Sequence, residues 1–560
     1  MADLPLFQQI KLPAPVVSDF DLSFANHLTT DAGRITPILC KELIPRDKVK
    51  ELGTELFIRC LPLTTPVMGR IKAYVHGFFV PNRIMWNKWE RFISGWDGIT
   101  ISDQTDPVPP YMHNQSGSET IAEKSLADYL GIPARTYAQD SLLFTLFRFN
   151  AYQRIYDEWY RDQNLESSDY VELTSGLHSS ISGSNYTLRY RAYRKDYFTS
   201  ALPWPQRGDQ VTFPLGISAP IKADVKYNGS NYIRLRSEGL KDQTMDSGSY
   251  VKNALGLEPG SSTTSTIGVL KTWGSKIDPD FTSSGKNVWF SSSANGNVAN
   301  LYADLSSANA LTVNEFRRTM ALQRWLETNA RGGSRYNETL YAHFGVQIPD
   351  YRINRSQYIG GASVQFNVDP VEQNSATVAG GTPQATLCGK ASSYGYLDIA
   401  SDFYPMEHGV LMLLLTIMPD ATYFQGVSRF LTKLDKFDYA WPEFANLGEQ
   451  EIENYELYAD GSTDATATGV FGYQSRYAEY KYSENELHGD LLKPGMQMWT
   501  TARKFSSSPT LGNTFIKVSS SGLSHIFADT STSNDHFIVE CYNHFKVERA
   551  LPIFGTPELS

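Results

Sequence analysis

Few residue groupings in this chain match a known catalytic pattern. The segment 385–392, ATLCGKAS, contains a Gly-Lys pair like that of a phosphate-binding loop. Gln384 stands where the first glycine of such a loop belongs, and Ala391 replaces the Ser or Thr that would bind magnesium. Neither a G-x-S-x-G nor an H-E-x-x-H motif occurs in the sequence. We therefore predict an ordinary turn here and no enzymatic activity.

Two groups of neighbouring glutamates could do acid–base chemistry. A glycosidase needs two carboxylic acids about 5–10 Å apart across a cleft, usually from separate elements. Sequence neighbours in a polar loop more often face solvent, so we predict a solvated surface at both places. The groups are Glu449, Glu451 and Glu453, and Glu484 and Glu486.

The cysteines and histidines do not form a recognisable metal site. The four cysteines are widely spaced and include no C-x-x-C pair, whereas zinc sites usually show paired ligands at short spacing. We predict buried free thiols, no metal and no cofactor. For the histidines within predicted elements we expect packing and hydrogen bonding rather than catalysis. These residues are Cys40, Cys60, Cys388 and Cys541, and His76, His343 and His544.

The densest group of cations in the middle of the chain comprises Arg331, Arg335, Arg352 and Arg355. Guanidinium groups bind phosphates or carboxylates through paired hydrogen bonds, so these residues could contact DNA or a neighbouring subunit. The net charge of −10, with Lys11 the single Lys or Arg among the first 33 residues, argues against strong DNA binding. We predict interface or structural roles for Arg331 and Arg335. Arg352 and Arg355 are the candidates for nucleic-acid contact.

Two aromatic phrases supply candidate interface anchors. Trp86, Trp89 and Phe92 recur every three residues, which predicts one short amphipathic helix over 84–92. Their stripe could stack on bases, but a stripe facing the core is the favoured interpretation. Trp204 lies between two prolines and is followed by Arg207, so we expect it to be buried against another element or subunit.

The elements that would position these residues are mainly strands. The run VLMLLLTIM at 410–418 predicts a strand covered on both faces and is far shorter than the ~20 residues of a membrane helix. The segment 537–551 partly alternates between apolar and polar residues. Expected strands lie at 54–81, 408–419 and 536–549, and expected helices at 125–131, 140–164 and 312–333, the last with a Thr312–Glu315 capping box and glycines at its end.

The segment 216–311 differs from the rest of the chain. It is rich in Ser, Gly, Asn and Thr, with short apolar stretches between. We interpret it as an inserted β-rich excursion, and a disordered linker is the alternative. The predicted organisation is an N-terminal part with helical insertions at 1–215, the insertion at 216–311, a helix with connecting loops at 312–400, and C-terminal strands and tail at 401–560.

Three phrases carry a family resemblance. They are FFVPNRIMWNKWERFISG (78–95), YFTSALPWPQRGD (197–209) and RWLETNARGGSRYNETLYAHFGVQIPD (324–350). Together with the order of the flanking strands, they resemble the major capsid proteins of the Microviridae, within them the gokushovirus-like branch. One departure is Arg46-Asp47, where Gly-Asp is commoner in that family. The resemblance to the family does not cover the stretch 216–311.

The resemblance implies a mainly β fold, an eight-stranded antiparallel viral jelly roll with long loop and helix insertions. It also implies a T=1 icosahedral shell of sixty copies around a circular single-stranded DNA genome. The implied partners are that DNA, a small basic DNA-packaging protein, a pilot or minor capsid protein and a host cell-surface receptor. The insertion would project around threefold axes as a candidate for host attachment. The expected location is the virion, after assembly in the host bacterial cytoplasm.

Two other classes share parts of this pattern. A carbohydrate-binding or carbohydrate-active β-sandwich would show similar aromatic content and acidic charge. A phage spike protein would assemble as a trimer and usually shows longitudinal repeats, which this sequence lacks. Uniform particles would favour the capsid protein over both.

Overall fold

The fold is taken from a computed structural model of the chain. For the strands between 221 and 303 the backbone alone is described. The residues described are 16–94, 107–115, 117–178, 186–209, 211, 221–223, 233–237, 288–292, 301–303, 313–375, 381, 383–459, 461, 469–531 and 533–554.

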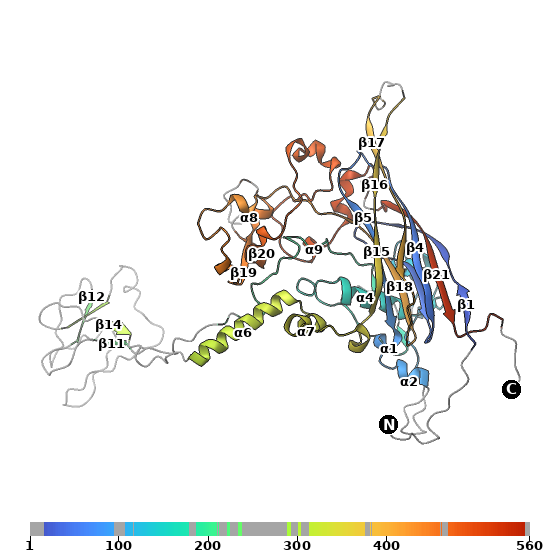
Figure 1. The fold of residues 1–560 in the computed structure, drawn as a ribbon, viewed down its shortest axis with the longest axis horizontal. Helices are drawn as coiled ribbons and strands as arrows, with labels where there is room; N and C mark the ends of the chain where they lie inside the picture. The colour runs from blue at the N-terminus through green and yellow to red at the C-terminus, as the bar shows by residue number, and fades with distance from the viewer. Residues whose placement is uncertain are drawn as a thin grey trace, which may run out of the picture. The chain divides into compact units, whose positions relative to one another are not determined.

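Two antiparallel sheets form the core of the larger unit, residues 1–209 and 325–560 (Figure 1). The first sheet has the order β1-β21-β4-β17-β16, and β2 also pairs with β21. The second sheet has the order β15-β5-β18-β3. The bounds in the first sheet are β1 (Ser18–Asp21), β2 (Phe24–Thr30), β4 (Lys48–Cys60), β16 (Asn367–Glu372), β17 (Leu387–Ala400) and β21 (Phe537–Arg549). Those in the second are β3 (Thr36–Leu43), β5 (Ile71–Pro81), β15 (Gln357–Gln365) and β18 (Gly409–Pro419).

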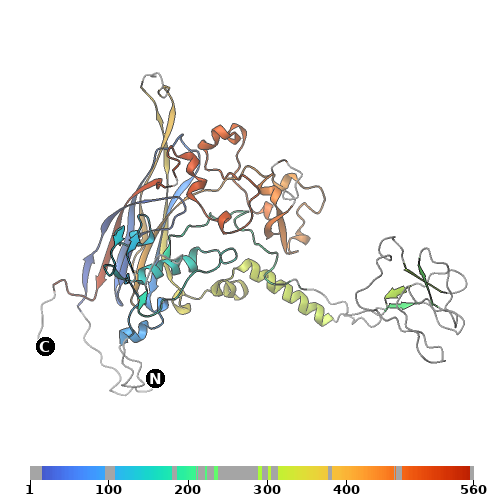
Figure 2. The same cartoon turned by 180° about the vertical axis from the view of Figure 1, so that it is seen from behind.

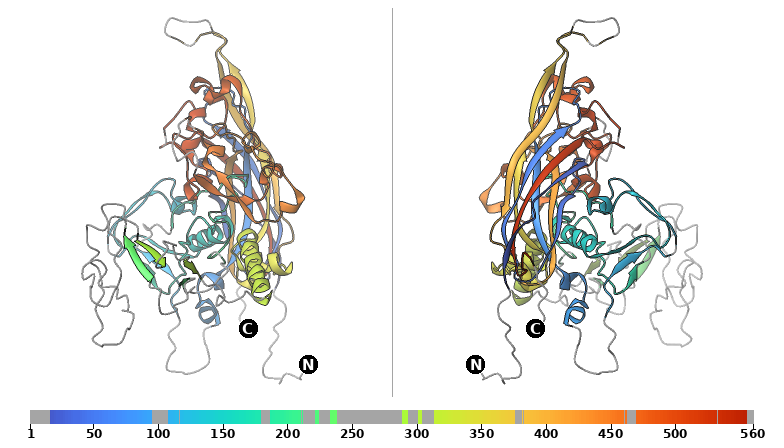
Figure 3. Two further views of the ribbon diagram at one scale, coloured as in Figure 1. Left: turned by 90° about the vertical axis from the view of Figure 1, so that its left-hand side faces the viewer. Right: turned by 90° about the vertical axis from the view of Figure 1, so that its right-hand side faces the viewer.

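The two sheets pack face to face around one apolar core (Figure 3). In β21, Phe537 and Val539 are buried in this core. Ile538 and Glu540, which alternate with them along the strand, are exposed. The period of two in the sequence therefore has its expected cause, because successive side chains of a strand point to opposite faces. Strands on both sides of the core confirm the prediction of a mainly β protein built as an antiparallel sandwich.

Strand β18 is buried along its whole length, as its continuous apolar sequence predicts. Leu411 and Leu413 belong to the core between the sheets. Met412 and Leu414 belong to a second core on the other face of the same strand. Helices cover that outer face (Figure 2). They are α1 (Asn82–Met85), α2 (Trp89–Ser94), α3 (Leu126–Tyr129), α4 (Phe147–Ile155) and the π-helix Tyr156–Tyr160, with the short strands β6 (Tyr111–His113), β7 (Glu119–Ile121), β8 (Arg135–Tyr137), β9 (Leu143–Thr145) and β10 (Leu177–His178).

Two helix predictions in this layer need correction. The segment 84–92 is not one helix, because Trp86 adopts an extended conformation (φ −141°, ψ 115°) and separates α1 from α2. The segment 140–164 begins with β9, and its helix starts at Phe147 and continues as a π-helix. The helix predicted over 125–131 is present as α3. It begins after Ser125, whose hydroxyl accepts a hydrogen bond from the Asp128 N–H.

The C-terminal half adds a third core beside the sandwich. Helix α6 (Val313–Gly332) ends where its glycines predict, and Gly333 has a φ of +91°. Thr312 of the predicted capping box lies outside the described residues. The other elements are α7 (Tyr336–Phe344), β19 (Glu449–Glu453), α8 (Asn454–Leu457), β20 (Val470–Ser475) and α9 (Asn513–Ile516), with 3₁₀ turns at Asp350–Ile353, Arg429–Leu431, Pro442–Phe444, Ala478–Tyr480, Gly489–Leu492, Pro494–Trp499, Ser520–Gly522 and Ser524–Ile526.

Residues 210–324 form a compact unit of their own. Its described strands make two antiparallel pairs. Strand β11 (Ile221–Ala223) pairs with β14 (Leu301–Ala303), and β12 (Ile233–Ser237) pairs with β13 (Val288–Ser292). The first pair holds residues 221–223 beside residues 301–303. The second pair is formed by residues that lie between these two strands in the sequence.

Candidate subunit interface

The first two predicted anchors, Trp86 and Trp89, belong to the core of the helical layer. Trp86 is fully buried, and its indole N–H donates to the Ser175 hydroxyl at 3.1 Å. Trp89 is partly buried, with its ring centroid 5.5 Å from that of Phe147 and 5.8 Å from that of His408. Trp86 therefore has no surface on which a base could stack.

Trp204 lies in a segment tied to strand β20. Leu202 exchanges two backbone hydrogen bonds with Tyr473, of 2.8 and 2.7 Å. The Trp204 side chain is partly buried, and its indole N–H is buried without a hydrogen-bond partner among the described residues. Arg207, three residues on, is exposed. A buried donor without an acceptor costs free energy. We therefore expect the Trp204 N–H to find an acceptor outside the described residues.

Arg331 and Arg335 bind within the chain, at the join of α6 and α7. The Arg331 Nε donates to a carboxylate oxygen of Glu449, whose side chain is almost wholly buried. The Arg335 guanidinium donates to Glu338 at 3.0 Å and to the backbone carbonyl of Arg161 at 2.9 Å. Both arginines thus fix α6 and α7 to the rest of the fold.

Arg352 and Arg355 differ in their surroundings. Arg352 is exposed on the 3₁₀ turn that precedes β15. The Arg355 guanidinium lies 3.8 Å from the centroid of the Trp159 ring and donates to the Glu158 backbone carbonyl at 2.7 Å. Burial lowers the pKa of Arg355, and Asp350, with its carboxylate 3.7 Å away, opposes that effect. These contacts leave Arg352 the more accessible of the two.

The most exposed of the large apolar side chains in the described residues, Leu434, lies in the loop of residues 430–447. Leu434 is 95% exposed and Leu431 is 78% exposed. The loop is nevertheless held in place from within. The Lys433 ammonium is buried 3.1 Å from a Glu479 carboxylate oxygen and 4.0 Å from the Tyr480 ring centroid. An apolar surface held in a fixed conformation is typical of a protein interface.

Helix α7 and the end of α6 from Trp325 onward add further exposed apolar groups in the same compact unit as this loop. The ion pair between Arg331 and Glu449 joins the end of α6 to the residues that follow the loop. Apolar side chains of α6 are exposed, those up to Leu322 within the unit of residues 210–324 and Trp325 within the larger unit. The exposed apolar residues of the helical part are Val313, Phe316, Met320, Leu322, Trp325, Tyr336, Tyr341, Phe344 and Val346, and those of the loop are Phe430, Leu431, Leu434, Phe437, Tyr439, Trp441 and Leu447.

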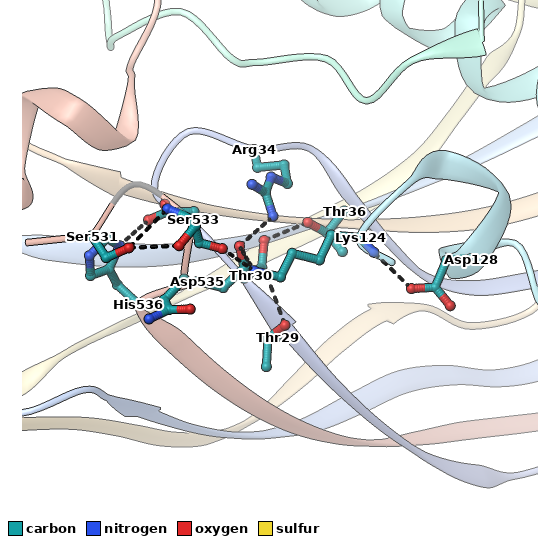
Figure 4. A network of polar contacts seen from close by, with 12 residues as sticks. Thr29, Thr30, Arg34, Thr36, Lys124, Asp128, Ser531, Ser533, Asp535 and His536 are labelled. Carbon is teal, nitrogen blue, oxygen red and sulfur yellow. Dashed lines mark hydrogen bonds and ion pairs between the residues drawn. The ribbon is translucent and has the colours of Figure 1, made fainter. Parts of the chain in front are cut away.

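A buried polar network joins three distant parts of the sequence (Figure 4). The Asp535 carboxylate accepts from the Arg34 guanidinium at 2.9 Å and from the Thr29 hydroxyl at 2.8 Å. The Lys124 ammonium lies 3.6 Å from Asp535 and donates to the Ser533 carbonyl at 2.7 Å. The network fixes the chain before β21 to the strand β2 and to the start of α3.

The same network contains a buried histidine. The His536 Nδ1 lies 3.1 Å from an Asp31 carboxylate oxygen, and its Nε2 lies 3.2 Å from the Asp529 carbonyl. The His536 ring is stacked on Phe527 with 4.3 Å between centroids. Every side chain here is engaged with another part of the chain, so the network serves the fold.

Most of the other residues flagged by their chemistry have structural partners. His76 is hydrogen-bonded to Tyr160, His343 to Asn329 and His544 to Glu55, as predicted. All four cysteines are free, and burial raises the pKa of Cys40 and Cys541 to about 12. The prediction of burial is wrong for Cys388, which is exposed near the start of β17, where this strand pairs with β16 before its pairing with β4 begins.

The glutamate groups do not form a catalytic pair. Glu451 and Glu453 are exposed as predicted, but Glu449 is buried against Arg331 and Glu484 is half-buried. The solvated-face prediction is therefore wrong for these two residues: Arg331 at the end of α6 covers Glu449, and Glu484 is partly buried near Asp196 and Glu456. Within the described ranges, no three His, Cys, Asp or Glu side chains are placed to share a metal ion. Nor does any described helix combine the length and apolarity needed to cross a membrane.

Comparison with known proteins decides the family. The model of a phage family described as capsid protein (F protein) matches residues 14–559. The chain belongs to this F capsid protein family.

Curated relatives cover almost the same length. The chain is 33% identical to the capsid protein VP1 of Bdellovibrio phage phiMH2K, over 91% of this chain and 90% of that one. It is 32% identical to the capsid protein VP1 of Chlamydia phage 1, over 97% and 95%, and 27% identical to that of Spiroplasma virus 4, over 97% and 98%. The resemblance to Microviridae capsid proteins seen in the sequence is thereby confirmed, as is the type of protein, a structural protein of a bacteriophage virion.

Two features of this capsid protein were missed in the sequence. The loop at 430–447 carries four aromatic residues between 437 and 444, interspersed with charges, a signal that was present but unused. The Asp535 network had no usable signal, because Arg34 and Asp535 are separated by 501 positions. Only the pairing of β2 with β21 brings them together.

Proposed function

We propose that this chain assembles with itself into a closed T=1 icosahedral shell of sixty copies around a circular single-stranded DNA genome. The observation that carries the proposal is the ordered loop at 430–447, which holds Leu431 and Leu434 in solvent. Obligate interfaces bury about 2,000–5,000 Å² and resemble a domain core cut in half. A second copy covering the loop, the end of α6 from Trp325 onward and α7 would remove their apolar groups from water.

The buried Trp204 indole N–H supports the same interpretation. It lacks an acceptor among the described residues, and a neighbouring subunit could supply one. Tryptophan and arginine are common anchors of protein interfaces, which suits Trp204 and the exposed Arg207. In this proposal Arg331 and Arg335 act indirectly, because they hold α6 and α7 in the position that the neighbour meets.

The order of the strands supports the eight-stranded jelly roll as the building block. Along the chain, β2, β4, β17 and β21 enter one sheet while β3, β5, β15 and β18 enter the other. Two four-stranded layers filled in this way are the arrangement of viral jelly rolls. In this proposal β1 and β16 extend the first layer at its edges.

The proposed partners follow from charge. With a net charge of −10, the shell binds DNA weakly, and a small basic packaging protein supplies most of the neutralisation. Exposed Arg352 is the better of the two arginine candidates for a DNA contact. A pilot or minor capsid protein completes the particle, which is assembled in the host bacterial cytoplasm. The role is structural rather than catalytic.

The segment 216–311 is proposed to project from the shell at threefold axes and to bind the host receptor. It lies within a compact unit that is separate from the sandwich-bearing part of the chain. Surface segments of this kind tolerate change and often carry recognition.

Particle formation by the expressed chain tests the shell. The wild-type protein should give uniform particles by electron microscopy and light scattering. Leu434→Asp should leave the chain folded by circular dichroism but prevent particles, because it places a charge in the proposed interface. Leu143→Asp is the matched control, since Leu143 is also exposed, at 67%, and lies in the short strand β9. Particles from Leu434→Asp, or trimers alone from the wild type, would contradict the proposal.

A further inference from the structure

A cavity of about 260 Å³ opens on the outer face of the second sheet, beside the helical layer. Its floor includes His76 and Phe78 of β5, and Tyr358 of the neighbouring strand β15 lies at its rim with 44% of its surface exposed. Gly361 leaves the room that these groups need, because a Cβ there would lie 2.6 Å from both His76 and the Tyr358 hydroxyl. The cavity is small for a drug-sized ligand but large enough for one ring system.

The π-helix Tyr156–Tyr160 provides another wall of the cavity. It places Trp159 and Tyr160 at the cavity, with the Trp159 ring centroid 5.6 Å from that of Tyr358. Single turns of π-helix are rare and are frequent at functional sites. The Trp159 indole N–H donates to the Ser356 hydroxyl at 2.9 Å, so the wall is fixed before any ligand arrives.

Arg191 gives the cavity its charge. Its guanidinium lies 4.8 Å from the Tyr74 ring centroid and 5.8 Å from that of Tyr160. One terminal nitrogen donates to the Thr416 hydroxyl at 2.9 Å, and the other guanidinium N–H groups make no further hydrogen bond to the described residues. The lining residues include no carboxylate, in a chain whose net charge is −10. This local surplus of positive charge favours an anionic ligand.

His76 adds a neutral polar group to the floor. Burial and the nearby Arg191 lower the pKa of His76 to about 4, so its imidazole is uncharged at neutral pH. Its Nδ1 and the Tyr160 hydroxyl are 2.8 Å apart. A neutral ring with one bonded nitrogen can donate to or accept from the polar edge of a ligand.

We propose that this cavity binds one nucleotide unit, with the base against the aromatic wall and a phosphate on Arg191. Base stacking on aromatic side chains is worth about 1–3 kcal/mol per base and tolerates any sequence. Paired hydrogen bonds from a guanidinium suit a phosphate. The unit belongs either to a packaged single strand, in which case the inference rests on the proposed function, or to a free nucleotide.

Calorimetric titration of the full-length chain tests the proposal, with dAMP, deoxyadenosine and a ten-nucleotide single strand as probes. Arg191→Gln should weaken dAMP binding at least tenfold and leave deoxyadenosine unchanged, because deoxyadenosine has no phosphate. Tyr358→Ala should weaken binding of both ligands, and circular dichroism of the variant checks that it is folded. Tyr394→Ala is the matched control, since Tyr394 is 70% exposed on the other sheet, and it should bind as the wild type does.

The single strand distinguishes the two sources. Competition between the strand and dAMP assigns the site to packaged DNA, whereas dAMP binding without competition assigns it to a free nucleotide. Absence of dAMP binding at millimolar concentration, or equal binding by the wild type and both pocket variants, overturns the proposal. If particles nevertheless form and contain DNA, the shell proposal stands alone. If dAMP binds but the particles are empty, DNA enclosure fails and the pocket remains.

Discussion

At Asp535 a single carboxylate faces two cations, Arg34 and Lys124, in a nearly dry environment. The Asp535 side chain is 3% exposed and that of Arg34 is 14% exposed. Removing one partner of such a pair leaves buried charge without compensation and typically costs about 3–5 kcal/mol. We expect Asp535→Ala to lower the free energy of unfolding of the unassembled chain by that amount, measured by urea denaturation.

An exposed ion pair provides the control for this prediction. Asp490 lies 2.6 Å from Lys493, with both side chains at least 67% exposed. Surface pairs contribute about 0–1 kcal/mol, so Asp490→Ala should change the unfolding free energy by less than that. Equal effects of the two variants would show that the Asp535 network does not hold the N-terminal strand to β21.

Glu484 gives the second prediction at the residue scale, a dependence on pH. Burial, followed by the nearby charges of Asp196, Glu456 and Glu486, raises the pKa of Glu484 from 4.5 to about 8. The folded chain therefore holds this proton more tightly than the unfolded chain. Its stabilising effect is complete below pH 4.5 and is lost as the pH rises through 8.

Replacement of Glu484 by glutamine removes this titration. Because glutamine stays neutral, the variant should gain stability over the wild type as the pH rises from 5 to 8.5, measured as melting temperature in the unassembled chain. Glu451→Gln is the control, since Glu451 is exposed and is not among the charges that raise the pKa of Glu484. A constant difference between Glu484→Gln and the wild type across this range would contradict the assigned pKa.

At the scale of elements, a helix or strand could be predicted from the sequence when its cause lies in neighbouring residues. Strand β18 was predictable because burial on both faces demands an unbroken apolar run. The end of α6 was predictable because Gly333 takes a φ of +91°. Arg46, where the resembled family more often has glycine, adopts a φ of +75°. Glycine takes this conformation with less strain, which explains why glycine is the commoner residue at this position.

The errors arose where tertiary packing overrides spacing. Trp86 and Trp89 have helical spacing, yet the chain is extended at Trp86, and both rings pack against Phe147 from opposite sides of this break in the helix. The start of the 140–164 segment is a strand because β9 pairs with β6. The candidate site was predictable only as residue types: the sequence points to Trp204 and Arg331, but burial and partners needed the fold.

At the scale of the whole molecule, the chain separates a packed part from an inserted one. The sandwich and helical layer share strand β18, so damage to either core is transmitted to the other. Residues 210–324 form their own compact unit, so changes within it should leave the packed part intact. This division leads to a test that separates assembly from attachment.

The insertion can be shortened at a place the structure provides. Ala223 and Leu301 face each other in the antiparallel pair of β11 and β14. Replacing residues 224–300 by Asn-Gly converts this pair into a hairpin, because that dipeptide suits a two-residue turn between antiparallel strands. Loop length itself contributes little to closure entropy, so folding of the sandwich should be preserved.

Shells should still form from the shortened chain, while adsorption to host cells falls at least tenfold, because the proposed attachment segment is absent. Particle counts by electron microscopy and adsorption counts on the same preparation measure the two properties separately. The Leu434→Asp variant should show the opposite result, because it keeps the whole insertion but should not form shells. If the shortened chain fails to assemble, the insertion is part of the shell contacts. If its particles adsorb as well as the wild type, attachment resides elsewhere on the capsid.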